Sequence, residues 1–313
     1  MFQEKPRTPE YWHGLRDHLE QKVAKFSKEM EERFNWAGPF PWFTFAFDWD
    51  ESKIQARIRR IGLQPEIRFS LGLLIWLDSI ALWINRDGTF RQKLQVFEAH
   101  PDDDLSQWMI HLWCDWIFRH EIGHFFCGHI SRIADTLVEG EPRVSESIDL
   151  TRAMEFDADM FAALFFFGFL SQCLEKRIYQ DFYGTDDVRA VFWDLGMLFG
   201  ALFTAFEEIQ PVDTAEKTHP PVAVRWYCFS IEGLHTFHRL RGSSVAAEGN
   251  CLLNGLVNTL MRLEQIGKGF GPTLLNTSID VEETRKTLLA AGIDKSRLFR
   301  SWDDWLFRAP LPN

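Results

Sequence analysis

The stretch from residue 110 to residue 127 most constrains the fold, because it places ionisable groups inside an apolar helical stripe. Its apolar residues and two histidines recur at intervals of three and four residues, which is the period of one helix face. The stripe consists of Ile110, Trp113, Ile117, His120, His124 and Cys127. We therefore predict a buried helix whose histidines need partners, since burying an unpaired polar group costs about 2–7 kcal/mol.

The same stretch contains the sequence His-Glu-Ile-Gly-His at residues 120–124. Histidines four residues apart lie above one another on a helix, so both rings can reach one metal ion. Glu121 would then point toward a water on that ion and act as a general base in hydrolysis. The alternative is a pair of core histidines that hydrogen-bond to carbonyl and carboxylate groups.

A second helical stripe supplies a candidate for the third ligand that a catalytic zinc site requires. Glu155 and Asp159 lie four residues apart in an otherwise apolar segment, so they share one face of the predicted helix. Two carboxylates that point inward need compensating charge. We predict that Glu155 binds the metal and that Asp159 accepts a hydrogen bond from the far nitrogen of a ligand histidine.

Two polar residues near these stripes are interpreted as lying outside the set of ligands. His129 comes five residues after His124 and points about 140° away from its face, so it is either a surface residue or a support for a ligand. Asp157 falls on a different face from Glu155 and is interpreted as a solvated carboxylate. The longer metzincin motif does not fit, because Cys127 stands where it needs a glycine.

Three motifs in this order resemble known metallopeptidases. The sequence HEIGH followed by EFDAD resembles the gluzincin pattern, in which a glutamate completes the HExxH site. A later THPPVAVR, at residues 218–225, makes the order similar to the HtpX-like metallopeptidase family. That family has membrane spans beside the motif, and this chain shows no clear ones. ImmA/IrrE-type peptidases and Lit-type phage-exclusion peptidases are therefore alternatives.

The resemblance implies a zincin-like fold with an active-site helix that carries HExxH. It implies one Zn²⁺ ion with the ligands His120, His124 and Glu155, and Glu121 as the base. It also implies that His219 donates to the transition-state oxyanion, with Arg225 as its nearby support. The predicted activity is zinc-dependent hydrolysis of peptide bonds in a protein or peptide substrate. The alternative is a non-catalytic metal-binding module with a regulatory or interaction role.

The N-terminal part is predicted to form one helix followed by a small sheet. Residues 9–34 are rich in charged residues and predict an exposed helix. Side chains alternate between apolar and polar around residues 43–49, 54–58 and 67–71, which is the period of strands. Turn residues separate these three stretches, so we predict a three-stranded antiparallel sheet, with an edge available to an extended peptide.

The remainder of the chain has a helical period. The predicted helices lie near residues 72–84, 104–135, 149–179, 186–209, 220–240, 244–267 and 280–291. The fold class is α+β and mostly helical. We expect one domain over residues 1–313, made of an N-terminal part (1–100), a catalytic core (101–240) and C-terminal helices (241–313).

The composition indicates which classes of partner and which cell compartment to expect. The net charge is −11, so the surface repels phosphate backbones and we expect no nucleic-acid partner. The apolar stretches at 69–84, 160–170 and 191–206 are shorter than the roughly 20 residues of a membrane span, which favours buried core helices over a membrane-associated form. The five cysteines form no CxxC pair, and no apolar leader precedes the first helix. We therefore expect a cytoplasmic protein.

Overall fold

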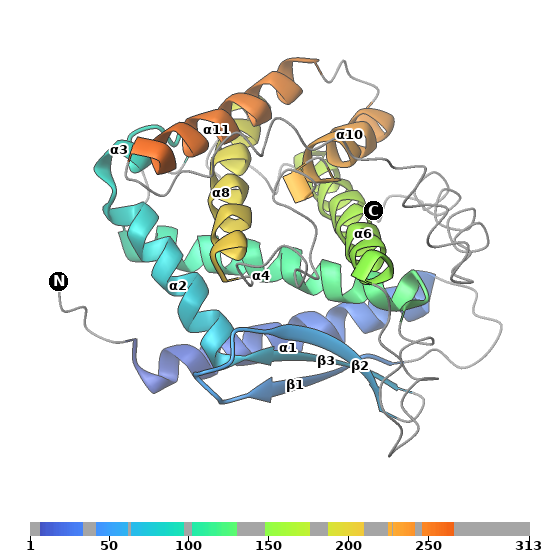
Figure 1. Cartoon of the computed structure of the whole chain (residues 1–313). Helices are drawn as coiled ribbons and strands as arrows, with labels where there is room; N and C mark the ends of the chain where they lie inside the picture. The colour runs from blue at the N-terminus through green and yellow to red at the C-terminus, as the bar shows by residue number, and fades with distance from the viewer. Residues whose placement is uncertain are drawn as a thin grey trace. The chain divides into compact units, whose positions relative to one another are not determined.

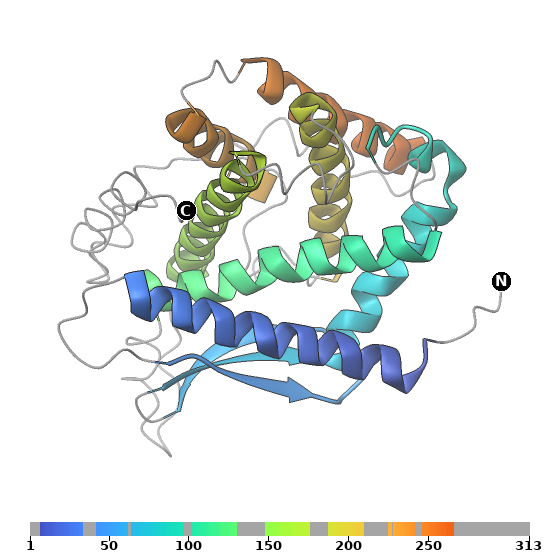
Figure 2. The same cartoon turned by 180° about the vertical axis from the view of Figure 1, so that it is seen from behind.

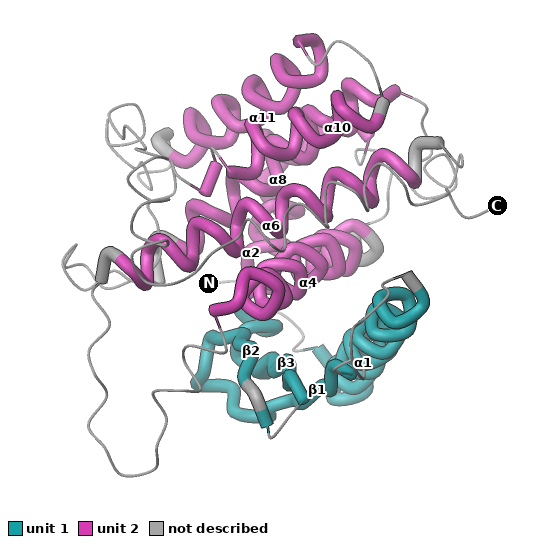
Figure 3. The backbone as a smooth tube through the Cα atoms, turned by 90° about the vertical axis from the view of Figure 1, so that its right-hand side faces the viewer, with its two compact units in different colours: residues 1–76 teal, residues 77–313 magenta. Residues whose placement is uncertain are grey.

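The computed structural model describes residues 7–33, 42–61, 64–96, 102–129, 148–175, 187–209, 225–226, 228–241 and 246–265. It confirms an α+β, mostly helical fold with one small sheet among these residues (Figure 1). Backbone contacts divide the chain into two compact units, residues 1–76 and residues 77–313 (Figure 3). The expected single domain with its three parts stays a prediction.

The first unit joins one long helix to the sheet. Its elements are α1 (Pro9–Arg33), β1 (Thr44–Asp48), β2 (Ala56–Ile61) and β3 (Gln64–Ser70). Helix α1 packs beside β1 (Figure 2). Leu15, Leu19 and Val23 form an apolar stripe on this helix, and all three are buried. The hydroxyl oxygen of Ser27 accepts a hydrogen bond from the backbone N–H of Phe43, at 3.2 Å. One face of α1 therefore fixes the entry into β1.

The sheet is mixed, so the prediction of an antiparallel sheet is wrong for one of its two pairings. The strand order is β1-β3-β2, and the central strand β3 is antiparallel to β2 but parallel to β1. Thr44 lies opposite Glu66 in the parallel pair, and Ala56 lies opposite Phe69 in the antiparallel pair. Alternation shows which side chains share a face, but it carries no information about which strand is the neighbour.

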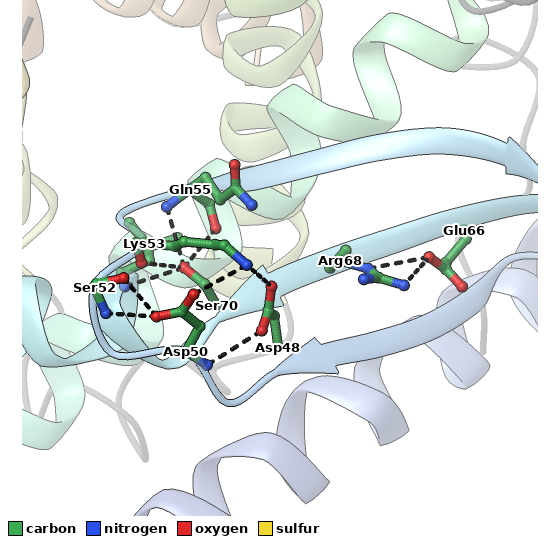
Figure 4. A network of polar contacts seen from close by, with 9 residues as sticks. Asp48, Asp50, Ser52, Lys53, Gln55, Glu66, Arg68 and Ser70 are labelled. Carbon is green, nitrogen blue, oxygen red and sulfur yellow. Dashed lines mark hydrogen bonds and ion pairs between the residues drawn. The ribbon is translucent and has the colours of Figure 1, made fainter.

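The connection between β1 and β2 passes across the end of β3, which is why these two strands do not form a hairpin (Figure 4). The hydroxyl of Ser70 donates to the carbonyl oxygen of Lys53 at 2.6 Å, and its backbone N–H donates to that of Gln55 at 3.1 Å. A Cβ on Gly72 would lie 2.2 Å from the Lys53 oxygen. Glycine is therefore required where the connection crosses.

The second unit is helical. Its described elements are α2 (Leu71–Arg86, which begins before residue 77), α3 (Gly88–Arg91), α4 (Asp102–Phe126), α6 (Ile148–Glu175), α8 (Val188–Ile209), a π-helical turn η1 (Cys228–Glu232), α10 (Gly233–Arg241) and α11 (Ala246–Gln265). Most bounds agree with the predicted helices, but α4 ends at Phe126, before the end of the helix predicted near 104–135. The helix predicted near 220–240 differs, because η1 comes before the regular turns of α10. The predicted helix at 280–291 lies outside the described residues.

Aromatic rings form the centre of this unit. The buried indole of Trp116 on α4 makes edge-to-face contacts with Phe166, Phe199, Phe203 and Phe229, at centroid distances of 5.3–6.2 Å. These phenylalanines come from α6, α8 and η1, so one ring cluster joins four elements. Edge-to-face pairs add about 0.5–1.5 kcal/mol each beyond the burial of their apolar area. The chain contains 29 phenylalanines and 13 tryptophans, and this cluster shows that part of them packs in the core of the second unit.

Helix α8 contains a long apolar segment with one carboxylate. The stretch Val188–Phe206 is, within the described part of the chain, the one helix long and apolar enough to cross a membrane, and 78% of its most apolar window is buried in the protein. The side chain of Asp194 accepts hydrogen bonds from the backbone N–H groups of Gln95 and Val96, both at 2.8 Å. This buried charge thus has backbone partners inside the unit.

Candidate metal centre

Helices α4 and α6 approach closely at a glycine within the histidine motif (Figures 1 and 3). A Cβ on Gly123 would lie 3.1 Å from the Cα and the carbonyl oxygen of Ala158, tighter than ordinary side-chain contacts. Gly123 separates the two histidines on α4 by sequence, and Ala158 lies between the two predicted carboxylates on α6. The absence of a side chain at Gly123 therefore allows the functional groups of the two helices to meet.

The three predicted ligands converge at this crossing. The Nε2 atom of His120 lies 3.1 Å from a carboxylate oxygen of Glu155. The Nε2 atom of His124 lies 3.2 Å from Nε2 of His120 and 3.5 Å from the other Glu155 oxygen. Tetrahedral zinc bonds of 2.0–2.1 Å require donor atoms about 3.3–3.4 Å apart. This donor set, two imidazoles and a carboxylate, therefore fits one zinc ion.

The second ring nitrogen of His120 contacts a buried carboxylate. Its Nδ1 atom lies 2.8 Å from Oδ1 of Asp159, which is the place predicted for that residue. The guanidinium of Arg225 donates to both oxygens of Asp159, at 2.9 and 3.0 Å. Arg225 also lies over the rings of Phe203 and Phe206, at 5.6 and 5.0 Å. The carboxylate is thus fixed from two sides.

The charges of this group stabilise one another. Burial alone would lower the pKa of His120, but the carboxylates of Asp159 and Glu155 outweigh it and raise that pKa to about 10. Burial opposes ionisation of Asp159, yet Arg225 and His120 hold the pKa of Asp159 below its ordinary value. Without a bound ion, a protonated imidazole balances the carboxylates. This compensation explains how apolar α6 can bury ionised groups.

The structure describes the general-base candidate, Glu121, but not the predicted oxyanion donor. Glu121 follows His120 on α4 and is buried, whereas His124 and Glu155 are partly exposed. The candidate site therefore has a side that solvent reaches. His219 lies outside the described residues, so its role stays a prediction. Arg225 was expected to support His219, and its described ion pair is with Asp159.

The interpretation of Asp157 as a solvated carboxylate is wrong, because Asp157 is fully buried. Of the two alternatives for His129, a surface residue is wrong, because its side chain is also fully buried, and a support for a ligand stays a prediction. The Nδ1 atoms of His129 and His124 lie 2.9 Å apart, and Nε2 of His129 lies 3.2 Å from Oδ2 of Asp157. Helix α4 ends before this point, and Gly128 has φ +81°, so an angle extrapolated along the helix does not apply. The glycine directly before His129 is the feature of the sequence that could have indicated this change of direction.

Residues 110–230 match the family Peptidase U49. Neither a search of curated proteins nor a search of solved structures found a match. The matched segment contains both helices that carry the predicted ligands, α4 from residue 110 onward and all of α6, together with Arg225.

The family match supports a peptidase, and therefore a hydrolase that acts on a protein substrate. Its description names no metal and no HExxH subfamily. The finer resemblance to gluzincins, and to HtpX-like enzymes among them, stays a prediction. The segment that matches the family and the group of His120, His124 and Glu155 share the same two helices.

Proposed function

We propose that this chain is a zinc-dependent endopeptidase that cleaves a protein substrate. The observation that carries the proposal is the convergence of His120, His124 and Glu155, whose donor atoms lie 3.1–3.5 Å from one another. The match to a peptidase family over the same helices supports the choice of reaction. One ion would bind to these three residues and keep a fourth position for water, as catalytic zinc sites do.

The residues around the site have complementary roles in this mechanism. A bound zinc ion would lower the pKa of its water to about 7. Glu121 would accept the proton of the attacking water and pass it to the leaving amine. Asp159 would fix the ring of His120 through Nδ1, and Arg225 would keep that carboxylate ionised. His219 is the proposed donor to the oxyanion.

Glu121 distinguishes this proposal from a non-catalytic metal-binding module. Closed structural zinc sites commonly have four protein ligands and favour cysteine. In the described part of the chain, the group at the crossing of α4 and α6 consists of two histidines and one glutamate. A structural site would have no use for a glutamate directly after the first histidine ligand.

Metal analysis beside a proteolysis assay tests the proposal. We expect about one zinc ion per chain in the wild type and in Glu121→Gln, with cleavage lost in the variant by a factor of at least about 100, since the base itself is removed. Glu155→Ala should lose most of the metal. Comparing the proteomes of host cells that express the wild type and Glu121→Gln would identify the substrate.

Glu32→Gln is a control, because Glu32 lies on an exposed part of α1 and forms a long ion pair with Lys28. It should retain both metal and cleavage. Full cleavage by Glu121→Gln would contradict the assignment of the base. A stoichiometric zinc ion in Glu155→Ala would contradict the third ligand. Stoichiometric zinc with no cleaved substrate in any host would favour the non-catalytic module.

A further inference from the structure

A chain of buried polar groups extends from the ring nitrogen of His124 that does not face the predicted ion. It runs from Nδ1 of His124 to Nδ1 of His129 at 2.9 Å, and from Nε2 of His129 to Oδ2 of Asp157 at 3.2 Å. We propose that His129 and Asp157 are positioning residues that hold His124 in its metal-binding orientation. This inference rests on the proposed metal site, and it assigns a role to two residues outside the ligand set.

Metal binding determines the direction of each hydrogen bond in this chain. If Nε2 of a neutral His124 binds the ion, its proton must be on Nδ1. That N–H then donates to Nδ1 of His129, so the proton of His129 is on Nε2. The Nε2–H donates in turn to the carboxylate of Asp157. Each donor thus has one acceptor, and both imidazole tautomers are fixed.

The local backbone explains why a residue beyond the helix can reach back to His124. The backbone N–H of Cys127 still donates to the carbonyl of Gly123 at 2.8 Å, as in a continuing helix. Gly128 then adopts φ +81°, a conformation that favours glycine, and donates to the carbonyl of Phe125 at 3.0 Å. The chain turns at this position, and His129 lies fully buried against His124.

The two ligand histidines are therefore supported by different hydrogen-bond connections, one short and one longer. His120 contacts Asp159 directly, and His124 reaches Asp157 through His129. Both aspartates are on α6 and both are fully buried. Groups that orient a ligand histidine in this way typically contribute 10- to 100-fold to metal affinity. We expect His129 and Asp157, which form the longer connection, to change metal affinity by about that factor.

A competing role for the same residues is a second metal site. Donor atoms of Cys127, His129 and Asp157 lie within 4.8 Å of one another, and all three residues are buried. The hydrogen-bond chain is favoured because the 2.9 and 3.2 Å contacts of His129 link it to a predicted ligand on one side and a carboxylate on the other. The two roles predict different numbers of ions per chain.

The test measures zinc affinity by competition with a chelator, and the visible spectrum of the Co²⁺-substituted protein, in the full-length chain. His129→Phe removes the acceptor for His124 and should weaken zinc binding about 10- to 100-fold. His129→Asn keeps an oxygen that can accept from His124 and should recover part of that loss. Both changes should shift the Co²⁺ bands, which a purely structural role would leave in place.

Asp157→Asn tests the second link with an almost isosteric change. It should weaken zinc binding less than His129→Phe, and the double variant should lose less than the product of the two single effects, because both act through one chain. Asp194→Asn is the matched control. It removes another fully buried charge that accepts two backbone hydrogen bonds, and should leave zinc affinity unchanged.

Three results would overturn the inference. In the first, His129→Phe binds zinc within twofold of the wild type. In the second, the wild type holds two ions and Cys127→Ser holds one, which would assign His129 to a second metal site. In the third, the wild type binds no metal at all, in which case the proposed function fails as well. The first two results leave the proposed function intact, so the two failures can be told apart.

Discussion

At the scale of single residues, the candidate site consists of charges that are buried in compensating pairs. Asp159 is fully buried and receives two hydrogen bonds from Arg225 and one contact from His120. Removing one member leaves the other charge buried without its partner, whereas removing both leaves an apolar contact. This asymmetry makes the pair accessible to experiment.

We expect Asp159→Asn to lower the free energy of unfolding by about 3–5 kcal/mol, because the Arg225 charge stays buried. It should also weaken zinc binding about 10- to 100-fold. The double change Asp159→Leu with Arg225→Met should restore most of the stability but not the zinc affinity. Urea unfolding and chelator competition measure the two quantities. Equal stability of Asp159→Asn and the wild type would contradict the buried pair.

The spacing of residues predicted only part of this site. Positions four residues apart on a helix are enough to pair His120 with His124, and Glu155 with Asp159, from the sequence alone. The same rule failed for His129, because helical geometry ends with α4 and a left-handed glycine changes the direction of the chain. The position of Asp157 in the apolar pattern of α6 also gives no indication that its carboxylate contacts His129.

At the scale of elements, glycines determine how closely helices approach. A Cβ on Gly196 of α8 would lie 2.1 Å from the carbonyl oxygen of Leu252 on α11, and one on Gly255 of α11 would lie 2.2 Å from that of Trp193 on α8. The two helices therefore meet backbone to backbone in both directions. Such contacts have no flexible side chain that could move aside.

We expect Gly196→Ala to lower the free energy of unfolding by about 1–3 kcal/mol, because the added methyl group forces α8 and α11 apart. Gly14→Ala is the control on α1, where a Cβ would meet nothing within 4 Å. That change should be neutral or stabilise by up to about 1 kcal/mol, since alanine favours the helix. Denaturant midpoints of both variants measure the difference. An unchanged midpoint for Gly196→Ala would contradict the close contact.

The elements themselves were largely predictable, and their connections were not. Periodicity placed α1, α2, α6, α8 and α11 within a few residues of their bounds. The parallel pairing of β1 with β3 depends on where the next segment crosses, and that is set by the contacts of Ser70 and the space at Gly72. These contacts join residues that are distant in the sequence, so no local pattern contains them.

At the scale of the whole molecule, the described residues proposed as metal ligands and as their supports all belong to the second unit. Residues 110–230, which match the peptidase family, also lie within it. The ring cluster around Trp116 joins α4 and α6 to α8 and η1. An ion held between α4 and α6 should therefore stabilise this unit as a whole, because its ligands and its core share the same helices.

Zinc removal tests that coupling. A ligand that binds only the folded state stabilises it by about 2.7 kcal/mol at a free concentration 100 times its dissociation constant. We expect chelator-stripped wild type to unfold at a lower temperature, and added Zn²⁺ to restore the original value. Glu121→Gln should show the same rise, because the role proposed for Glu121 is that of a base and not of a ligand. Glu155→Ala should show little rise, and hydrogen exchange should locate the zinc-dependent protection in α4 and α6. A full rise in Glu155→Ala, or protection confined to residues 1–76, would contradict the assigned ligands.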